Sequence, residues 1–243
     1  FTSSFNNNIY IYNILIIFYF YIFISIMCQV TKIAHRGYSD IYKDNTMEAF
    51  KKAVEREFDM IEMDLQLCKH DIIIIYHDQY IQKKLISDLT IEEIKHIDND
   101  IMTFEEFIYK FDYTKTNLYL DLKGSNKLAE KLHQFIDVHN LQYHNIHFAS
   151  FNLYHLEILF NFNKSYKLGL ITYNHLTNDM LDFMIKKYKL YFVALSWNTL
   201  EETSIEYIKS LHVKVYTYTA DKPCVLEFIK KYNVDGIVSN IRI

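Results

Sequence analysis

The segment AHRGYSD, residues 34–40, places a histidine and an arginine directly before one of only four glycines in the chain. Glycine adopts positive φ at little steric cost, so Gly37 can turn the backbone sharply behind His35 and Arg36. Such a turn can aim two basic side chains at an anion while the backbone passes close to it. The segment therefore predicts an anion site that residues elsewhere in the chain must complete.

Two carboxylates and a second histidine are candidates to complete this site. In the segment MIEMDLQL, Glu62 and Asp64 are two positions apart. Because side chains alternate across a strand, both carboxylates point to the same face. The run IIIIY follows after only the residues CKHD, too few for a parallel crossover, so it should fold back as a hairpin strand. With Lys69 and His70 as the hairpin tip, Glu62 lies opposite His77, and the three groups gather near the end of the strand.

Eight runs rich in β-branched and aromatic residues are the candidate strands. They cover residues 32–35, 60–67, 118–122, 146–151, 167–171, 192–197, 213–219 and 236–239. Amphipathic segments between them are helix candidates, with Asn45, Asn178 and Asp221 as expected caps: residues 45–57, 125–140, 178–188 and 221–232. The alternation predicts a parallel sheet, and eight strands predict a (β/α)8 TIM-type barrel with the hairpin strand as an extra element after strand 2. Such barrels carry their active sites at the carboxyl ends of the strands.

Composition bounds the remaining possibilities. The chain has 243 residues, half of them apolar, which is enough for one large domain or two small ones. A net charge of -4 gives no electrostatic footprint for nucleic acid, so we expect no nucleic-acid partner. The three cysteines lack metal-ligand spacing. The sequence contains no glycine-rich phosphate loop and no GxSxG motif, which argues against a phosphate-loop nucleotide site and against a serine hydrolase.

The N-terminal stretch, residues 1–26, differs from the rest of the chain because it has no charged residue. Residues 9–26 are apolar or aromatic apart from Asn13 and Ser25, which is about the length that spans a bilayer. Three interpretations stay open: translated sequence upstream of a true start at Met27, a membrane anchor, or a signal peptide. We expect residues 27–243 to form the functional domain. The protein would be cytoplasmic if it starts at Met27, and membrane-associated if residues 9–26 belong to it.

The order of several motifs resembles the glycerophosphodiester phosphodiesterases, which are phospholipase C-like phosphodiesterase barrels. The motifs are AHRG, DNTMEAF, IEMDLQL, IIIIYHD, YLDLKG and VDGIVSN, and together they extend over most of residues 33–240. The resemblance implies metal-dependent hydrolysis of glycerophosphodiesters to glycerol phosphate and an alcohol. It also implies that the insertion after the hairpin, residues 79–100, is a reduced form of the cap found in relatives.

The resemblance assigns roles to individual residues. It implies that His35 and His77 are an acid–base pair and that one divalent cation, Mg²⁺ or Ca²⁺, is bound by three carboxylates, Glu62, Asp64 and Asp121. Arg36 and Lys123 would bind the phosphate, with Asn45 and Trp197 as further candidates for substrate binding. For Trp197, which ends a strand at the rim, core packing is the alternative. These roles suit a phosphodiester, because its hydrolysis needs neutralised oxygens and a proton for the departing alkoxide.

Departures from the family pattern leave the substrate open. Asp121 stands where the family usually has glutamate, and Asp121 followed by Lys123 resembles the phospholipase D toxins of the sphingomyelinase D type. One alternative is therefore phospholipase D-like cleavage of lysophospholipid or sphingomyelin. Another is a catalytically weak barrel that binds phospholipid head groups. The expected partner is a small glycerophosphodiester or lysolipid, with membrane contact possible through residues 9–26, and the sequence indicates no oligomeric state.

Overall fold

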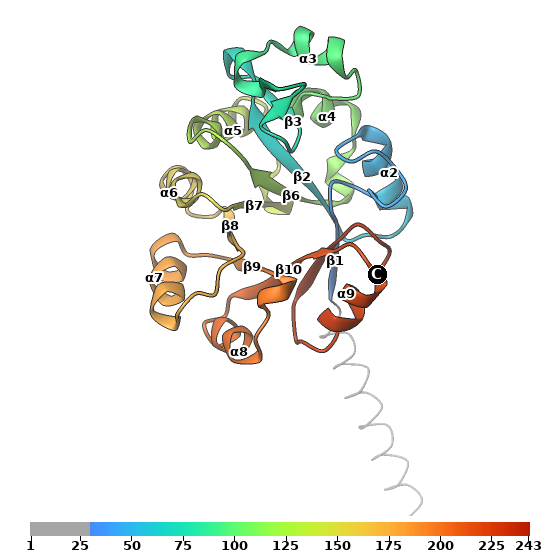
Figure 1. Ribbon diagram of the computed structural model, residues 1–243. Coiled ribbons are helices and arrows are strands. Elements are labelled where there is room, and N and C mark those ends of the chain that lie inside the picture. The colour runs from blue at the N-terminus through green and yellow to red at the C-terminus, as the bar shows by residue number, and fades with distance from the viewer. Residues whose placement is uncertain (1–29) are drawn as a thin grey trace, which may run out of the picture. The chain divides into compact units, whose positions relative to one another are not determined.

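Eight parallel strands close into a ring in the computed structural model, which describes residues 30–243 (Figure 1). The strands, in the order in which they neighbour one another, are β1 (Thr31–Ala34), β2 (Met60–Leu67), β6 (Asn117–Leu122), β7 (Ile146–Ser150), β8 (Lys167–Thr172), β9 (Phe192–Ser196), β10 (Lys214–Ala220) and β11 (Gly236–Ser239). Pairing of β1 with both β11 and β2 completes the ring. The predicted TIM-type barrel is confirmed. The stretch 1–26 lies outside the described residues.

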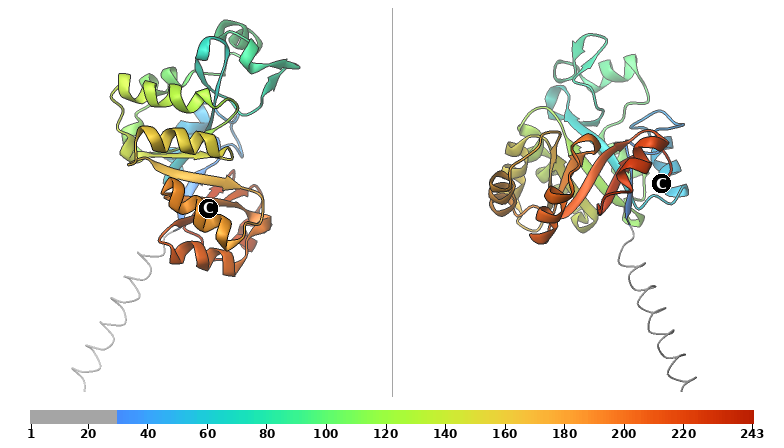
Figure 2. Two further views of the ribbon diagram at one scale, coloured as in Figure 1. Left: turned by 90° about the vertical axis from the view of Figure 1, so that its left-hand side faces the viewer. Right: turned by 60° about the horizontal axis from the view of Figure 1, so that its bottom comes forward.

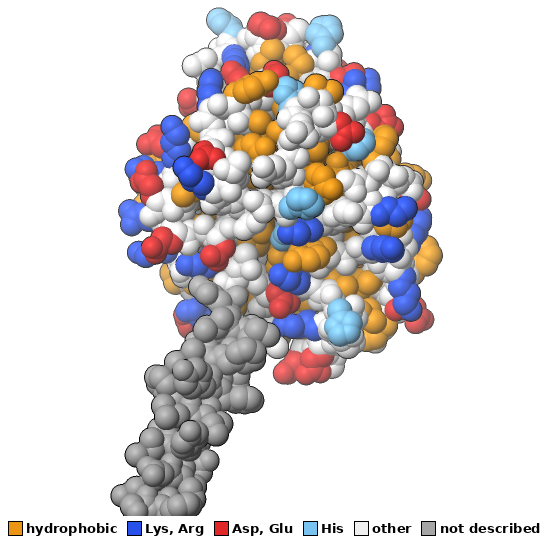
Figure 3. Space-filling view, turned by 180° about the vertical axis from the view of Figure 1, so that it is seen from behind, with side chains coloured by type: hydrophobic (Ala, Val, Ile, Leu, Met, Phe, Trp, Pro, Cys, Tyr) orange, Lys and Arg blue, Asp and Glu red, His pale blue; other side chains and the backbone are white. Residues whose placement is uncertain are grey.

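Helices join successive strands and surround the ring (Figure 1). They are α2 (Met47–Glu55), α4 (Phe104–Lys110), α5 (Lys127–Val138), α6 (Leu153–Phe162), α7 (Asn178–Tyr188), α8 (Glu202–Ser210) and α9 (Pro223–Ile229). Within residues 30–243, none of the helices has the length and apolar character that crossing a membrane requires. On the face seen in Figure 3, acidic and basic side chains are interspersed.

The helix caps lie one residue away from the predicted ones. Thr46 caps α2 by accepting a hydrogen bond from the Ala49 amide, and Thr177 caps α7 in the same way. Asn45 and Asn178 were therefore wrong as caps, and so was Asp221, because α9 starts after Lys222. Since a cap must place its side-chain oxygen over the first turn, a shift of one residue exchanges it for a neighbour with other partners.

The extra strand β3 (Ile73–Ile75) pairs antiparallel with the second half of β2, outside the ring. The predicted hairpin is present, but its register differs by one residue, because Leu65 pairs with Ile75. Its tip is the turn η1 (Lys69–Asp71), in which His70 and Asp71 both adopt positive φ, 66° and 62°. The predicted pairing of Glu62 with His77 is wrong, since the tip holds one residue more than expected.

A small cap follows β3 and matches the predicted reduced insertion. The short strands β4 (Tyr80–Ile81) and β5 (Lys84–Leu85) pair with each other, and the helix α3 (Ile91–Ile97) comes next. Figure 2 shows this cap beyond the end of the helical ring. The cap has a small core of its own, formed by Cys68, Ile74, Ile81, Ile86, Leu89, Ile94 and Ile101. The cap is therefore packed separately from the barrel core.

The barrel interior is filled by side chains from all eight strands. Its core cluster consists of Ile33, Met60, Tyr119, Ala149, Ile171, Phe192, Ala194, Tyr216 and Val238. Gly169 on β8 makes room for one of the rings, since a Cβ there would lie 2.0 Å from Cζ of Phe192. Side chains on a strand alternate, so positions two residues after Met60 and Tyr119 also face the interior. The packing therefore fixes where Glu62 and Asp121 point.

Candidate active site

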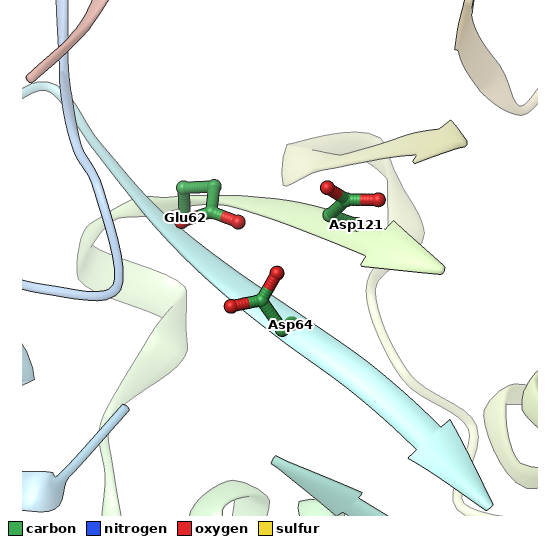
Figure 4. A group of neighbouring side chains, drawn as sticks. All are labelled: Glu62, Asp64 and Asp121. Carbon is green, nitrogen blue, oxygen red and sulfur yellow. The ribbon is translucent and has the colours of Figure 1, made fainter. Parts of the chain in front are cut away.

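Three carboxylates from β2 and β6 gather inside the barrel (Figure 4). Asp64 lies opposite Asp121 in the parallel register of the two strands, and Glu62 lies one interior position earlier on β2. Each side chain offers an oxygen within 4.8 Å of the others, and the residues are only 3, 1 and 6 % exposed. The two-residue spacing seen in the sequence thus becomes a buried acidic triad, consisting of Glu62, Asp64 and Asp121.

Two cations contact this acidic triad. Arg36 Nε lies 3.0 Å from an oxygen of Asp64. Lys123 Nζ lies 2.5 Å from Asp121 and 3.3 Å from the other oxygen of Asp64. Asp64 therefore stands between two positive charges, whereas neither cation forms an ion pair with Glu62 in the part of the chain that the structure describes.

The pKa values of the three carboxyl groups differ because their surroundings differ. Burial, together with the charges of Asp64 and Asp121, raises the pKa of Glu62 well above its usual range. Burial also raises the pKa of Asp121, to about 7, despite the attraction of Lys123. Burial acts in the same direction on Asp64, but Lys123 and Arg36 outweigh it and lower its pKa. The acidic triad thus holds protons that a further cation could displace.

The acidic triad suits a divalent cation. Its donors are all carboxylate oxygens, which Mg²⁺ and Ca²⁺ prefer. Asp121 Oδ1 is buried and accepts no hydrogen bond within residues 30–243. Three carboxylates facing two cationic side chains leave one negative charge uncompensated when all are ionised. Both the free oxygen and the charge balance fit a bound metal ion.

The turn after β1 brings His35 and Arg36 to the acidic triad. Arg36 and Gly37 both have positive φ, 55° and 80°, and a Cβ on Gly37 would lie 2.7 Å from the carbonyl carbon of Ala49. Glycine is therefore required at this position. The turn directs the Arg36 amide at Glu62, to which it donates a 2.7 Å hydrogen bond. Gly37 thus permits the close approach to Ala49 in the turn that carries the Arg36 amide.

His35 lies at the seam where β1 meets β11. Its Nδ1 is 2.6 Å from Oδ1 of Asn240, just past β11. An amide oxygen only accepts, so Nδ1 carries the proton and Nε2 has a free lone pair. Burial, helped by the neighbouring charge of Arg36, lowers the pKa of His35 to about 4. The imidazole is therefore neutral at physiological pH.

His77 faces the same cavity from outside the ring. It follows β3 by two residues, its side chain is 40 % exposed, and its Nδ1 lies 2.7 Å from a carboxylate oxygen of Asp78. The segment is held by Gln66, whose amide donates to the carbonyl oxygens of Tyr76 and Asp78 at 2.7 and 2.9 Å. Gln66 is not among the residues predicted from the sequence, although it continues the alternation of Glu62 and Asp64 on β2.

The remaining substrate-binding candidates have different positions. Asn45 is buried, and its amide bonds both the carboxylate and the backbone of Asp64, at 2.9 and 3.3 Å. It therefore supports a member of the acidic triad. Trp197 is not brought to the site: it begins the turn η5 (Trp197–Thr199) and packs edge-on against Phe228, with ring centroids 5.8 Å apart. Its ring is half-buried and does not line the cavity described below.

A cavity of about 190 Å³ unites these groups. Seven residues singled out from the sequence line it: His35, Arg36, Glu62, Asp64, His77, Asp121 and Lys123. Phe151 and Tyr218 also line it, and their rings meet edge-on at 6.0 Å. The Tyr218 hydroxyl is buried and makes no hydrogen bond to any described residue. Burial and the nearby Asp121 raise its pKa, so the phenol stays protonated and can donate.

Comparisons with known proteins agree on one family. Residues 35–241 match the glycerophosphoryl diester phosphodiesterase family. A glycerophosphodiester phosphodiesterase of Caldanaerobacter subterraneus subsp. tengcongensis is 29% identical over an alignment of 229 residues, which covers 86% of this chain and 93% of the relative. A human lysophospholipase D is 25% identical over an alignment of 134 residues, which covers 46% of this chain and 42% of the relative.

Solved structures share the fold. A glycerophosphodiester phosphodiesterase from Thermotoga maritima has a TM-score of 0.75 and 23% identity, over 87% of this chain and 95% of the other. An Oleispira antarctica phosphodiesterase, solved with the product sn-glycerol-3-phosphate, has a TM-score of 0.78 and 20% identity, over 87% and 93%. At these identities the likeness concerns the barrel itself.

Proposed function

The chain belongs to the glycerophosphoryl diester phosphodiesterase family and is an enzyme of that kind, and on this premise we propose a metal-dependent, two-histidine hydrolysis of glycerophosphodiesters to glycerol phosphate and an alcohol. One observation carries the proposal: His35, His77 and the acidic triad line a single cavity together with Arg36 and Lys123. Acid–base groups, cations and carboxylates are the parts that cleavage of an anionic diester needs.

Charge neutralisation is the first task of the site. Arg36 and Lys123 are held in place by Asp64 and Asp121, so their positive charges face the cavity at fixed positions. Electrostatic stabilisation of this kind is strong because the donors need no reorganisation when charge develops. Glu62, Asp64 and Asp121 would hold the divalent cation, Mg²⁺ or Ca²⁺. When bound, that cation would act as a Lewis acid on the phosphoryl oxygens.

Proton transfer falls to the two histidines. Because Asn240 accepts the Nδ1 proton of His35, the free Nε2 can take a proton from the attacking hydroxyl. A hydroxyl of the substrate's own glycerol is one such nucleophile, and attack by it would give a cyclic product that water then opens. His77, whose Nδ1 contacts Asp78, would deliver a proton to the departing alcohol oxygen. Exposure of His77 suits this role, since the alcohol must leave toward solvent.

A phospholipase D-like activity on lysophospholipid or sphingomyelin is the second candidate. The human relative named lysophospholipase D favours it, together with the close pair of Asp121 and Lys123. The same residues would carry the reaction, and only the group on the phosphate would differ. The apolar and aromatic wall formed by Phe151, Ile171 and Tyr218 would then meet the larger substrate.

Product analysis on the full chain tests the proposal. The protein is stripped with EDTA, titrated with Mg²⁺ or Ca²⁺, and given glycerophosphocholine and lysophosphatidylcholine in parallel. Metal-dependent release of glycerol phosphate from the first supports the proposed function. Choline release confined to the second transfers the assignment to the phospholipase D-like activity. Failure to cleave either diester in a folded, metal-binding protein would overturn both and favour head-group binding alone.

A further inference from the structure

The segment that carries Lys123 is hydrogen-bonded by side chains from the end of β7 and the first turn of α6. Lys123 follows β6 directly, and its ammonium reaches the acidic triad while passing 5.4 Å from the ring centroid of Phe151. The backbone on either side of Lys123 is bonded by two side chains that do not line the cavity, Ser150 and His155. Both residues are completely buried.

Three side-chain contacts join this pair to the Lys123 segment and to each other. His155 Nε2 lies 2.9 Å from the carbonyl oxygen of Ser125, and its Nδ1 lies 2.9 Å from Oγ of Ser150. Ser150 Oγ lies 2.8 Å from the carbonyl oxygen of Leu122. The residue before Lys123 and the second residue after it are thus both tied to the start of α6.

The hydrogen-bond pattern fixes the position of one proton of the imidazole. A carbonyl oxygen only accepts, so Nε2 of His155 donates to Ser125. Ser150 Oγ donates to the Leu122 carbonyl, and Nδ1 of His155 contacts the same Oγ. Burial lowers the pKa of His155, which agrees with a neutral ring. Asn152 adds a further bond, donating its amide to Asn126 Oδ1 at 2.6 Å.

A neutral histidine in a fully buried interface needs a reason, because an apolar side chain could fill the same space without losing contacts with water. We propose that Ser150 and His155 are positioning residues for the phosphodiesterase reaction, fixing residues 122–125 so that the Lys123 ammonium stays between the acidic triad and the phosphate. This inference rests on the proposed function, in which Lys123 neutralises the substrate anion. Ser150 and His155 act through Lys123 and touch neither substrate nor metal.

Kinetics of His155 variants test the inference. His155→Leu removes both hydrogen bonds and should lower kcat/KM by roughly 10- to 100-fold, since each net hydrogen bond contributes up to about one power of ten. In His155→Gln the side-chain amide can replace Nε2 as donor to Ser125, so most of the activity should return. Ser150→Ala removes only the hydroxyl and should lower activity in the same direction, which keeps the test usable if His155→Leu folds poorly.

A double-mutant cycle separates positioning from general structural support. In a Lys123→Met background, His155→Leu should cause no further loss, because its effect passes through the missing ammonium. The matched control is His133→Leu, since His133 is another histidine with little exposure, located on α5 and bonded to the Tyr166 hydroxyl at 2.9 Å. Full activity in His155→Leu, or losses that multiply with Lys123→Met, would overturn the inference.

Amide hydrogen exchange gives a readout that does not depend on turnover. The Lys123 amide donates to Leu65 at 2.9 Å, and its exchange should accelerate in His155→Leu and stay unchanged in His133→Leu. An inactive wild-type protein would contradict the proposed function, whereas unchanged exchange in an otherwise active His155→Leu protein would contradict only the inference about positioning.

Discussion

His35 and His77 reach the same cavity from two different kinds of structure. His35 follows β1 of the closed ring and bonds Asn240 where β1 meets β11. Burial lowers its pKa to about 4. His77 follows a three-residue strand outside the ring, is 40 % exposed, and bonds its own neighbour Asp78. The inner half of the site, His35 with the acidic triad, is thus fixed by barrel closure. The outer half, His77 with Asp78 and Gln66, is fixed by a few local hydrogen bonds.

This difference suits two tasks. A base must be unprotonated before the reaction, and burial beside Arg36 keeps His35 neutral. An acid must be protonated and close to the exit of the alcohol, which favours an exposed imidazole. Changes to the acidic triad in the inner half should therefore act on metal binding, whereas changes to the outer half should act on turnover alone.

Removal of His77 is expected to have the largest effect. His77→Ala should lower kcat by about 1,000-fold, within the range for loss of a general acid. Its metal affinity should stay close to that of the wild type, because the acidic triad is untouched. Steady-state assays with calorimetric Mg²⁺ titration check both values. Strong loss of metal affinity in this variant would break the division between the halves.

Glu62→Gln tests the inner half. Replacing the carboxylate should weaken cation binding by about 100-fold or more, since even outer-sphere partners of a ligand contribute 10–100-fold. Activity should recover in part at high metal concentration. The measurement is metal-activated turnover across a Mg²⁺ or Ca²⁺ series, with Glu57→Gln as a control on the exposed end of the α2 segment. Equal affinities for the two variants would remove Glu62 from the metal site.

Metal affinity should rise with pH. The pKa values of Glu62 and Asp121 are raised in the metal-free protein, the latter to about 7, so protons compete with the cation below that value. Displacing one proton from Asp121 predicts roughly tenfold tighter binding near pH 8 than near pH 6. Calorimetry in buffers of different ionisation enthalpy should detect the released proton. Binding that is independent of pH, or that weakens as pH rises, would contradict this assignment.

Gln66→Leu sharpens the comparison from the outer side. The variant loses both donors to the His77 segment, so kcat should fall about tenfold through misplacement of the imidazole. Because the carboxylates stay in place, metal affinity should not change. A fall in metal affinity with normal kcat would assign Gln66 to the inner half instead.

Tyr218→Phe is expected to have the smallest effect. The buried hydroxyl has no partner among residues 30–243, so its loss should slightly raise the thermal midpoint of the ligand-free protein. If the phenol donates to bound substrate, kcat/KM should nevertheless fall a few-fold. Tyr173→Phe, at an exposed neighbouring ring, is the control. A lower midpoint would indicate that the hydroxyl has a structural partner.

Much of the fold follows from periodicity in the sequence. The eight strands lie within one residue or so of the predicted ranges, because each is a short buried run bounded by polar segments. The hairpin register could not be read in this way. It depends on His70 and Asp71 adopting positive φ, a conformation uncommon for residues with side chains, and one added residue moves every pairing.

The candidate site shows the same division between features set by local sequence and features set by tertiary contacts. The sequence by itself placed Glu62 and Asp64 on one face, since alternation along a strand is a local property of the backbone. Only the closed barrel decided that Asp121 lies opposite Asp64, that Asn240 bonds His35, and that Trp197 packs away from the cavity. Contacts of this kind join residues far apart in the chain, and their geometry depends on how the strands close the ring, which no local pattern specifies.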